Sequence, residues 1–222
     1  MDILNNKITN ILQINNKSLY TVICIHGLGA NRYDLLTIYN MCNLNKKQHI
    51  KFLFLEAAYQ YITFNKSHMR AWFDIYNLET LDLNINDIYQ TINEISKVIM
   101  LENKKGIPNS NIIIIGFSQG AIIALSTLIS IDIINPMAGI ISLSGYIPDI
   151  LYEKINLRYV NTPIMFAHGK YDNIIPIINA KQSFNYMKNF FPNIIYREYN
   201  MNHTICNSEI NDISEFINKN LK

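Results

Sequence analysis

The chain is poor in cysteine, and the few cysteines are far apart. Only three of the 222 residues are cysteines, Cys24, Cys42 and Cys206, and none forms a C-x-x-C pair. An odd number at such spacing excludes a disulfide framework of the kind that holds small secreted domains together. No histidine and cysteine group has the spacing of zinc ligands either. We therefore expect free thiols, a reducing, cytoplasmic compartment and no metal.

Charge of one sign is also lacking. Charged residues make up 16% of the chain, and 19 Lys and Arg nearly balance 17 Asp and Glu. No basic tract exceeds two residues, so nothing indicates nucleic acid or an anionic membrane as a partner. The hydrophobic share of 49% is ordinary and excludes a solvated, disordered chain. Repeats and Pro/Gly-rich linkers are absent, so we expect one domain over residues 1–222.

Long hydrophobic runs are absent, with one exception. Residues 112–134 carry only Asp132 as a charge and are long enough to cross a bilayer. The segment 116–120, Gly-Phe-Ser-Gln-Gly, divides this run into a β-branched strand, a sharp turn and a helix. The first ten residues lack the apolar core of a signal peptide. We therefore expect no membrane-spanning segment.

Apolar runs alternate with longer helical patterns along the chain. The runs are continuously apolar, which is typical of parallel strands buried on both faces. They predict strands at residues 20–26, 50–55, 111–115, 137–144, 163–167 and 194–199. The longer patterns predict helices at residues 33–42, 85–102, 121–131, 177–191 and 208–220. We expect an α/β fold with a mostly parallel central sheet, helices on both faces and an edge strand at residues 8–14.

The most specific motif is the Gly-Phe-Ser-Gln-Gly segment at residues 116–120, which fits G-x-S-x-G. It lies between a predicted strand and a predicted helix, where a tight turn lifts the serine hydroxyl out of the sheet edge. The N–H of Gln119 would lie at the helix N-terminus, directed at a developing oxyanion. The motif predicts Ser118 as a nucleophile; the alternative is a glycine-flanked turn with a chance serine.

A serine nucleophile needs a base, and the chain has five histidines. His26, His168 and His203 follow predicted strands, beyond whose carboxyl ends sites gather in such sheets. His49 and His68 lie in polar loops and are expected to be surface residues. Chains with this elbow run nucleophile, acid, base, and only His203 lies downstream of both the serine and a strand-end carboxylate. His203 is therefore the predicted base.

Two aspartates follow predicted strands and could serve as the acid. Asp172, after the strand at residues 163–167, is the first candidate, and Asp149 is the alternative. The surroundings of Asp172 also suit an ordinary turn, which is compatible with the catalytic role.

A second oxyanion donor is predicted after the first strong strand. Residues 26–29 are His-Gly-Leu-Gly, and glycines after a strand let backbone N–H groups point into a site. We expect the Leu28 N–H to act beside that of Gln119, and His26 to be structural, bonded to loop backbone.

Together these motifs resemble the phospholipase/carboxylesterase family of α/β-hydrolases, which includes the acyl-protein thioesterases. The matching segments are residues 26–29, Arg-Ala-Trp-Phe-Asp at 70–74, residues 116–120, Ser-Gly-Tyr-Ile-Pro at 144–148, His-Gly-Lys-Tyr-Asp at 168–172 and His203. The resemblance covers about residues 20–220. It implies a single α/β-hydrolase domain, with Ser118 as nucleophile, Asp172 as acid and His203 as base. It also implies Leu28 and Gln119 as oxyanion donors and places Trp72 beside an acyl pocket.

Two hypotheses of different class follow. The first is a serine hydrolase that cleaves carboxylic esters or thioesters through an acyl-enzyme, without a cofactor. Carboxylesterase, lysophospholipase and acyl-protein thioesterase all stay open, because substrate choice depends on pocket shape. The second is a non-catalytic acyl-binding protein with the same fold. In both cases the partner is an acyl ester or thioester, either a small molecule or a lipid, and a homodimer is compatible with the sequence.

Residues 57–72 fit neither the strand nor the helix pattern and are predicted as a long loop. The segment combines aromatic side chains with few charges, a composition that marks acyl, lipid or partner surfaces. We expect Tyr61 and Phe64 to shape the acyl-binding cleft; the alternative is a loop that only packs on the core.

Overall fold

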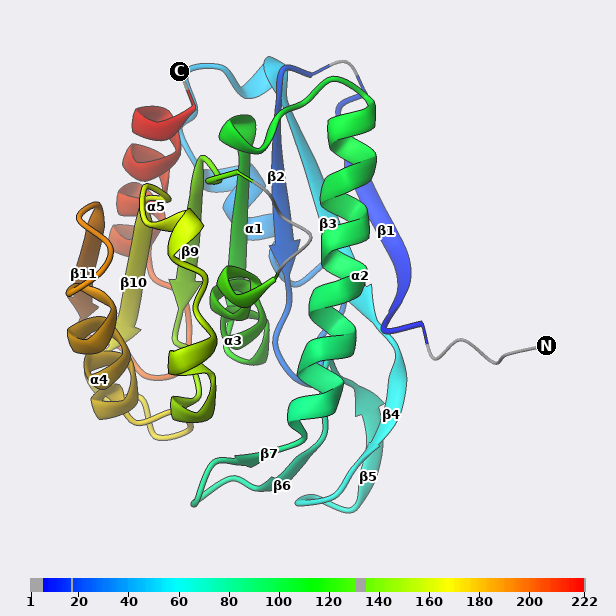
Figure 1. Ribbon diagram of the computed structural model, residues 1–222, viewed down its shortest axis with the longest axis vertical. Helices are drawn as coiled ribbons and strands as arrows, with labels where there is room; N and C mark the ends of the chain where they lie inside the picture. The colour runs from blue at the N-terminus through cyan, green and yellow to red at the C-terminus, as the bar shows by residue number, and fades with distance from the viewer. Residues whose placement is uncertain (1–5, 17, 131–134, 222) are drawn as a thin grey trace.

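A computed structural model describes residues 6–16, 18–130 and 135–221 of the chain. A seven-stranded sheet with strand order β1-β3-β2-β8-β9-β10-β11 runs through the centre (Figure 1). Only β1 pairs antiparallel; the other neighbours are parallel. The strands are β1 (Ile8–Ile14), β2 (Tyr20–Ile25), β3 (Ile50–Ala57), β8 (Ile112–Phe117), β9 (Gly139–Leu143), β10 (Ile164–Gly169) and β11 (Ile194–Tyr199). The predicted α/β fold, its mostly parallel sheet and its edge strand are confirmed.

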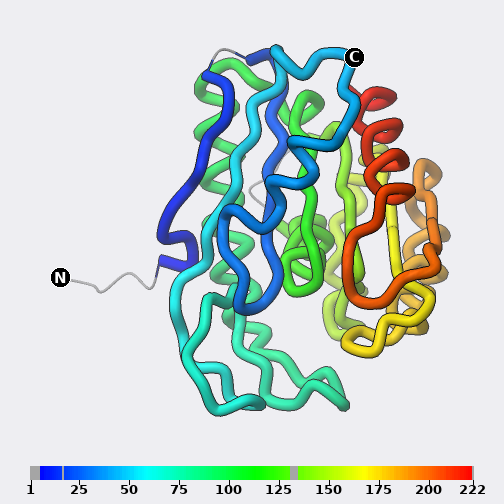
Figure 2. The backbone as a smooth tube through the Cα atoms, turned by 180° about the vertical axis from the view of Figure 1, so that it is seen from behind, coloured from blue at the N-terminus to red at the C-terminus, as the bar shows by residue number. Residues whose placement is uncertain are grey.

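Helices cover both faces of the sheet. One face carries α2 (Ile85–Lys104), α3 (Gln119–Ser126) and α4 (Ile177–Met187), and the other carries α1 (Leu36–Met41) and α5 (Asn207–Asn220) (Figures 1 and 2). Successive residues of a strand point to opposite faces. In β2, Ile23 and Ile25 therefore pack under α2 and α3, whereas Val22 and Cys24 pack under α1 and α5. This double burial explains why the strand runs are continuously apolar.

Several predicted helix ends are wrong by a few residues. The pattern at residues 33–42 gives a helix of only six residues, because residues 32–35 form turns. The pattern at 121–131 gives α3, which ends at Ser126 and passes into a 3₁₀ turn at Thr127–Ile129; residue 131 lies outside the described residues. The helix predicted at 177–191 stops at Met187, where turns follow.

The largest correction concerns residues 57–72, which are not a loop. They contain a hairpin of β4 (Tyr59–Ile62) and β5 (Ser67–Arg70). The tight turn between these strands uses Lys66 in a left-handed conformation, with φ of 53°. A second hairpin, β6 (Ile75–Asn77) and β7 (Asp82–Leu83), follows where the sequence analysis predicted nothing. These short, two-stranded ribbons carry too little periodicity to stand out from the sequence.

The parallel arrangement fixes where the functional groups gather. The parallel strands end at one edge of the sheet, and both hairpins project beyond that edge (Figure 1). The segments that follow β2, β8, β10 and β11 all begin there. In open α/β sheets, this edge is the usual place of a binding crevice.

Candidate active site

The structure brings Ser118, His203 and Asp172 together at this edge, from three separate strand ends. Ser118 follows β8, Asp172 follows β10 and His203 follows β11. The His203 Nε2 atom lies 2.9 Å from the Ser118 Oγ atom, and the His203 Nδ1 atom lies 2.7 Å from Asp172 Oδ2. Since the carboxylate only accepts, Nδ1 carries the ring proton and Nε2 accepts a hydrogen bond from the serine hydroxyl.

Ser118 occupies a strained turn between β8 and α3. Its φ of 54° and ψ of −118° are unusual for a residue with a side chain. The turn requires glycine on both sides: a Cβ atom on Gly116 would overlap the Gly120 carbonyl, and one on Gly120 would overlap the Ile25 carbonyl of β2. The strand, the helix and the neighbouring strand therefore meet at van der Waals distance, and this packing holds the hydroxyl at the sheet edge.

The carboxylate of Asp172 is fully buried and held by several donors. Its Oδ1 atom accepts the N–H groups of Ile174 and Ile175, each at 2.9 Å. Its Oδ2 atom faces His203 and, at 3.3 Å, His168 Nε2. Burial alone raises the pKa of Asp172, but the hydrogen bonds from His168, His203 and the Ile175 N–H outweigh it and hold the pKa well below the ordinary 3.8. Asp172 is therefore ionised at neutral pH and can stabilise a positive charge on His203.

Two backbone N–H groups flank the serine. Neither the Leu28 N–H, in the turn after β2, nor the Gln119 N–H, at the start of α3, donates a hydrogen bond among the described residues. Gln119 lies in the first turn of a helix, where N–H groups are unpaired and the helix dipole favours negative charge. Both residues line the same cavity as Ser118. The arrangement can therefore hold an oxyanion formed at a carbonyl that Ser118 attacks.

An apolar cavity of about 450 Å³ opens beside the serine hydroxyl. Its walls come from both hairpins, from α3 and from the loops after β2, β9 and β10. The apolar side chains that line it are Leu28, Ala30, Phe64, Phe73, Ile75, Leu78, Leu81, Leu83, Phe117, Ile122, Ile174 and Ile175. Asp34 is the carboxylate in this lining. A cavity of this size and composition suits an acyl chain.

Of the three residues expected to contact substrate, one lines the cavity. Phe64 is half-buried and forms part of the wall. Tyr61 points outward instead, is 47% exposed and packs edge-on against His68. Tyr61 shares the outer face of β4 with the exposed Tyr59, whereas Phe64 lies beyond the end of β4, in the turn before β5.

Trp72 is completely buried and lies next to the cavity lining without being part of it. Its indole N–H donates to the His26 carbonyl at 2.8 Å, and its backbone N–H donates to Gln119 Oε1 at 2.8 Å. Phe73, the next residue, lines the cavity in its place. Trp72 thus fixes the wall from behind.

The other histidines lie apart from the serine. His26 hydrogen bonds to backbone through both ring nitrogens, to the Gly27 carbonyl and the Ala57 N–H, as a structural residue does. His49 and His68 are exposed. His168 also follows a predicted strand, but the structure places it behind Asp172, away from the serine. Phe73 was not predicted to line the cavity, although it lies in the matching segment 70–74, and the wall residues of β6 and β7 carry no motif.

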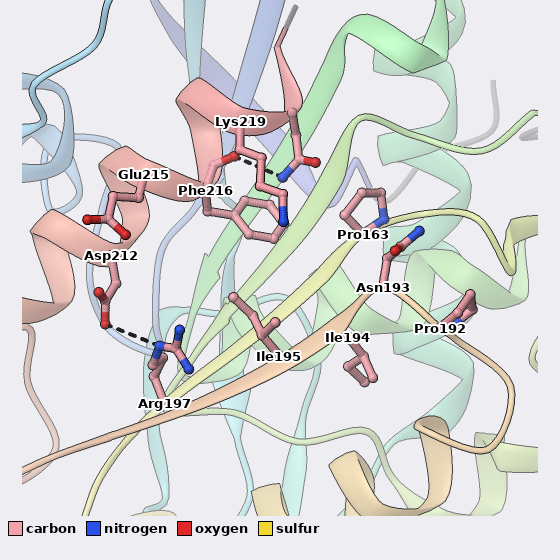
Figure 3. A pocket seen from close by; sticks show the side chains of 11 residues that line it. Pro163, Pro192, Asn193, Ile194, Ile195, Arg197, Asp212, Glu215, Phe216 and Lys219 are labelled. Carbon is pink, nitrogen blue, oxygen red and sulfur yellow. Dashed lines mark hydrogen bonds and ion pairs between the residues drawn. The ribbon is translucent and has the colours of Figure 1, made fainter.

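A second hollow, of about 430 Å³, lies between β11 and α5 (Figure 3). It is lined by charged and apolar side chains together, and the Arg197 guanidinium lies 3.7 Å from the Asp212 carboxylate. Its lining contains neither serine nor histidine. It is therefore separate from the Ser118 site.

The described residues carry no sign of a membrane-spanning helix or of a metal site. Within the described ranges, no helix is both long and apolar enough to cross a bilayer. The same part of the chain contains no group of three histidine, cysteine or carboxylate residues that could hold a metal ion.

A mostly parallel sheet with a serine elbow, and with histidine and carboxylate delivered by later strands, defines an α/β-hydrolase. Comparison with known proteins narrows the class. A family model described as phospholipase/carboxylesterase matches residues 6–221. The chain is 35% identical to acyl-protein thioesterase 1 of Saccharomyces cerevisiae over 213 residues, covering 90% of this chain and 92% of that protein. It is 30% identical to the Yarrowia lipolytica protein of the same name, covering 91% and 92%.

Solved structures show the same fold. The acyl-protein thioesterase 2 of Zea mays superimposes with a TM-score of 0.82 at 21% identity, covering 96% of this chain and 99% of that one. The Bacillus cereus carboxylesterase gives 0.77 at 18% identity, covering 97% and 96%. The chain belongs to the phospholipase/carboxylesterase family, which confirms the resemblance, and it is a hydrolase of carboxylic esters in the broad sense.

Proposed function

We propose that the protein hydrolyses acyl thioesters of proteins by a Ser118–His203–Asp172 triad through an acyl-enzyme. The observation that carries this proposal is the 2.9 Å contact between His203 Nε2 and Ser118 Oγ at the mouth of an apolar cavity. The thioester substrate is suggested by the acyl-protein thioesterases that the chain resembles at 30–35% identity.

In the first half of the reaction, Ser118 Oγ attacks the thioester carbonyl carbon while its proton passes to His203 Nε2. Asp172 stabilises the imidazolium, and the Leu28 and Gln119 N–H groups bind the oxyanion. Collapse of the tetrahedral intermediate breaks the carbon–sulfur bond, and the thiolate takes the proton from His203. The acyl group remains on Ser118 with its chain in the apolar cavity.

In the second half, His203 removes a proton from water as the water attacks the acyl-enzyme. The second tetrahedral intermediate uses the same two N–H groups. Its collapse breaks the bond to Ser118 Oγ, which recovers its proton from His203, and the carboxylic acid leaves. Each half thus begins and ends with neutral His203, and the complete reaction consumes one thioester and one water molecule.

A matched substrate panel tests the proposal. The panel compares an S-octanoyl cysteine peptide, its O-octanoyl serine counterpart, a lysophosphatidylcholine and a short aryl ester, with wild type and Ser118→Ala. We expect the thioester peptide to have the highest kcat/KM and Ser118→Ala to lose it. A clear preference for the lipid or the aryl ester would replace the proposed substrate with that class. Stoichiometric binding of the acyl peptide without release of thiol would instead support the non-catalytic acyl-binding protein.

A further inference from the structure

Asp172 lies between two histidines, and only one of them belongs to the proposed triad. His203 Nδ1 lies 2.7 Å from Asp172 Oδ2 on the side of the serine. His168, within β10, lies on the other side, with Nε2 3.3 Å from the same oxygen. The His168 side chain is fully buried and lies outside the cavity lining, so it touches no substrate.

The surroundings of His168 fix which ring nitrogen carries the proton. Nε2 lies 2.8 Å from the Ile175 carbonyl oxygen as well as near Asp172 Oδ2. Both of these oxygens only accept hydrogen bonds, so Nε2 is the donor. Nδ1 is buried and has no hydrogen-bond partner among the described residues. The ring is therefore the tautomer with its proton on Nε2, which donates to the Ile175 carbonyl and lies beside Asp172 Oδ2.

The contacts of Asp172 are then complete on both oxygens. Oδ1 accepts two backbone N–H groups, from Ile174 and Ile175. Oδ2 accepts from His203 Nδ1 and lies 3.3 Å from His168 Nε2, and the side chain is fully shielded from solvent. Without His168, Oδ2 would keep one donor and could turn toward or away from His203. The second histidine thus limits both the orientation of the carboxylate and the charge that it presents.

We propose that His168 is a positioning residue of the reaction, which holds Asp172 Oδ2 toward His203 and tempers its negative charge through the Nε2–H donor. This role rests on the proposed function of the triad. A donor that shares the charge of Asp172 reduces the stabilisation of protonated His203. Loss of the donor should therefore move the rising limb of the pH profile upward.

Other ionisable groups face this pair and enter the interpretation of such a profile. Asp172, in the turn after β10, faces His168 of β10 and His203 of the loop after β11. His203 faces Asp172, the Ser118 hydroxyl and the Phe117 ring, whose centre lies 4.9 Å from that of the imidazole. Asp34, in the segment between β2 and α1, lines the same cavity as His203. Because Asp34 is common to all variants below, its contribution cancels in their comparison.

The test compares His168→Met, which has no donor, with His168→Gln, whose amide N–H can take the place of Nε2–H. His49→Met, at an exposed histidine, is the control. We measure kcat and KM for the S-octanoyl peptide across the pH range, with thermal unfolding alongside. In His168→Met we expect kcat to fall about tenfold, the lower end for loss of such a supporting contact at metal sites. The inflection of the pH profile should rise, KM should change little, and His168→Gln should restore most of the kcat and the inflection.

Two outcomes would overturn the proposal. One is an unchanged inflection in His168→Met despite lower stability, which would make the residue a purely structural link to Ile175. The other is a His168→Gln protein that behaves like His168→Met. Either result together with an inactive Ser118→Ala protein rejects the role of His168 alone, whereas an active Ser118→Ala protein rejects the proposed function.

A measurement on the wild type keeps the proposal testable if the variants do not fold. Nitrogen-15 NMR of histidine-labelled protein at neutral pH reports the tautomer of each ring. We expect His168 to carry its proton on Nε2 and His203 to carry its proton on Nδ1. A His168 ring protonated on Nδ1 would overturn the proposal, since Nε2 could then donate nothing to Asp172.

Discussion

The Gln119 side chain spans the backbone of Trp72 across the space between α3 and the segment before β6. Its Oε1 atom accepts the Trp72 N–H at 2.8 Å, and its Nε2 atom donates to the Phe73 carbonyl at 2.8 Å. Thr91 Oγ1 donates to the Trp72 carbonyl at 2.6 Å. The residue beside the nucleophile thus fixes the backbone that carries Phe73 into the cavity wall.

This contact predicts graded effects of two substitutions at Gln119. Gln119→Met leaves two buried backbone groups unpaired and should lower the free energy of unfolding by about 2–4 kcal/mol. Gln119→Glu keeps an acceptor for Trp72 but brings an oxygen against the Phe73 carbonyl, and should be at least as harmful. Thermal unfolding and kcat would be compared with Gln48→Met, at an exposed position. Equal melting temperatures of Gln119→Met and wild type would show that the hydrogen bonds of the Gln119 side chain do not stabilise the protein.

The elbow glycines predict a steric effect. Gly116→Ala and Gly120→Ala each place a Cβ atom into backbone that cannot move without separating β8, α3 and β2. Each should cost more than about 4 kcal/mol, as only severe core changes do, and yield little folded protein. Gly106→Ala is the control, because no atom lies within 4 Å of its added Cβ and only its φ of 90° opposes it. Folded, active Gly116→Ala protein would contradict the described turn.

The cavity wall predicts that Phe64 and Tyr61 differ in their effect on chain-length preference. Phe64→Ala removes apolar contact with an acyl chain, and each buried methylene is worth about 0.8 kcal/mol. The loss in kcat/KM should therefore grow with chain length and reach about tenfold for octanoyl thioesters. Tyr61→Ala, on the outer face of β4, should leave the profile from butanoyl to hexadecanoyl unchanged. A changed profile in Tyr61→Ala and none in Phe64→Ala would place the acyl chain elsewhere.

The buried carboxyl of Glu209 predicts a pH-dependent stability. Burial raises the pKa of Glu209 from the ordinary 4.5 to about 8, and the negative charge of Asp212 adds to the rise. The nearby Cys206 N–H lowers the pKa in part, although neither carboxyl oxygen has a hydrogen-bond partner of good geometry among the described residues. The folded protein therefore binds a proton more tightly than the unfolded chain. The resulting stability is complete below pH 4.5 and is lost as the pH rises toward about 8.

Glu209→Gln should remove this dependence. Near neutral pH it should raise the free energy of unfolding by about 2–3 kcal/mol, and near pH 4 it should change little. The measurement is thermal unfolding at both pH values, with Glu215→Gln on the exposed side of the same helix as control. A gain of equal size at both pH values would show that ionisation of Glu209 is not its cause.

The sequence predicted the parts of the fold that have a strong local cause. Continuous apolar runs predicted six of the seven strands of the central sheet to within a few residues, and a weaker pattern predicted β1. The inner strands are recognisable because both of their faces are buried. The glycines of the elbow and the order of residues along the chain pointed to Ser118, Asp172 and His203, which the structure brings within hydrogen-bonding distance. Because the ends of parallel strands meet at one edge of the sheet, the order of these residues along the chain was sufficient to predict that they lie together.

The cavity wall could not be predicted in the same way. Phe73 and Leu81 line it because two small hairpins fold over the sheet edge, and hairpin packing depends on tertiary contacts. Tyr61 and Phe64 are both aromatic and belong to the same segment, yet Tyr61 faces solvent and Phe64 faces the cavity. The role of Trp72 also depends on partners far along the chain, His26 and Gln119, which no spacing rule identifies.

The most direct test of the account is covalent labelling of the native protein with a fluorophosphonate, followed by peptide mass spectrometry. A serine activated by His203 Nε2 at 2.9 Å should be labelled in a single adduct at Ser118 with full loss of activity. Labelling should vanish in Ser118→Ala and be strongly slowed in His203→Ala. An unlabelled Ser118 in protein that still hydrolyses thioesters, or labelling at another residue that abolishes activity, would contradict the account.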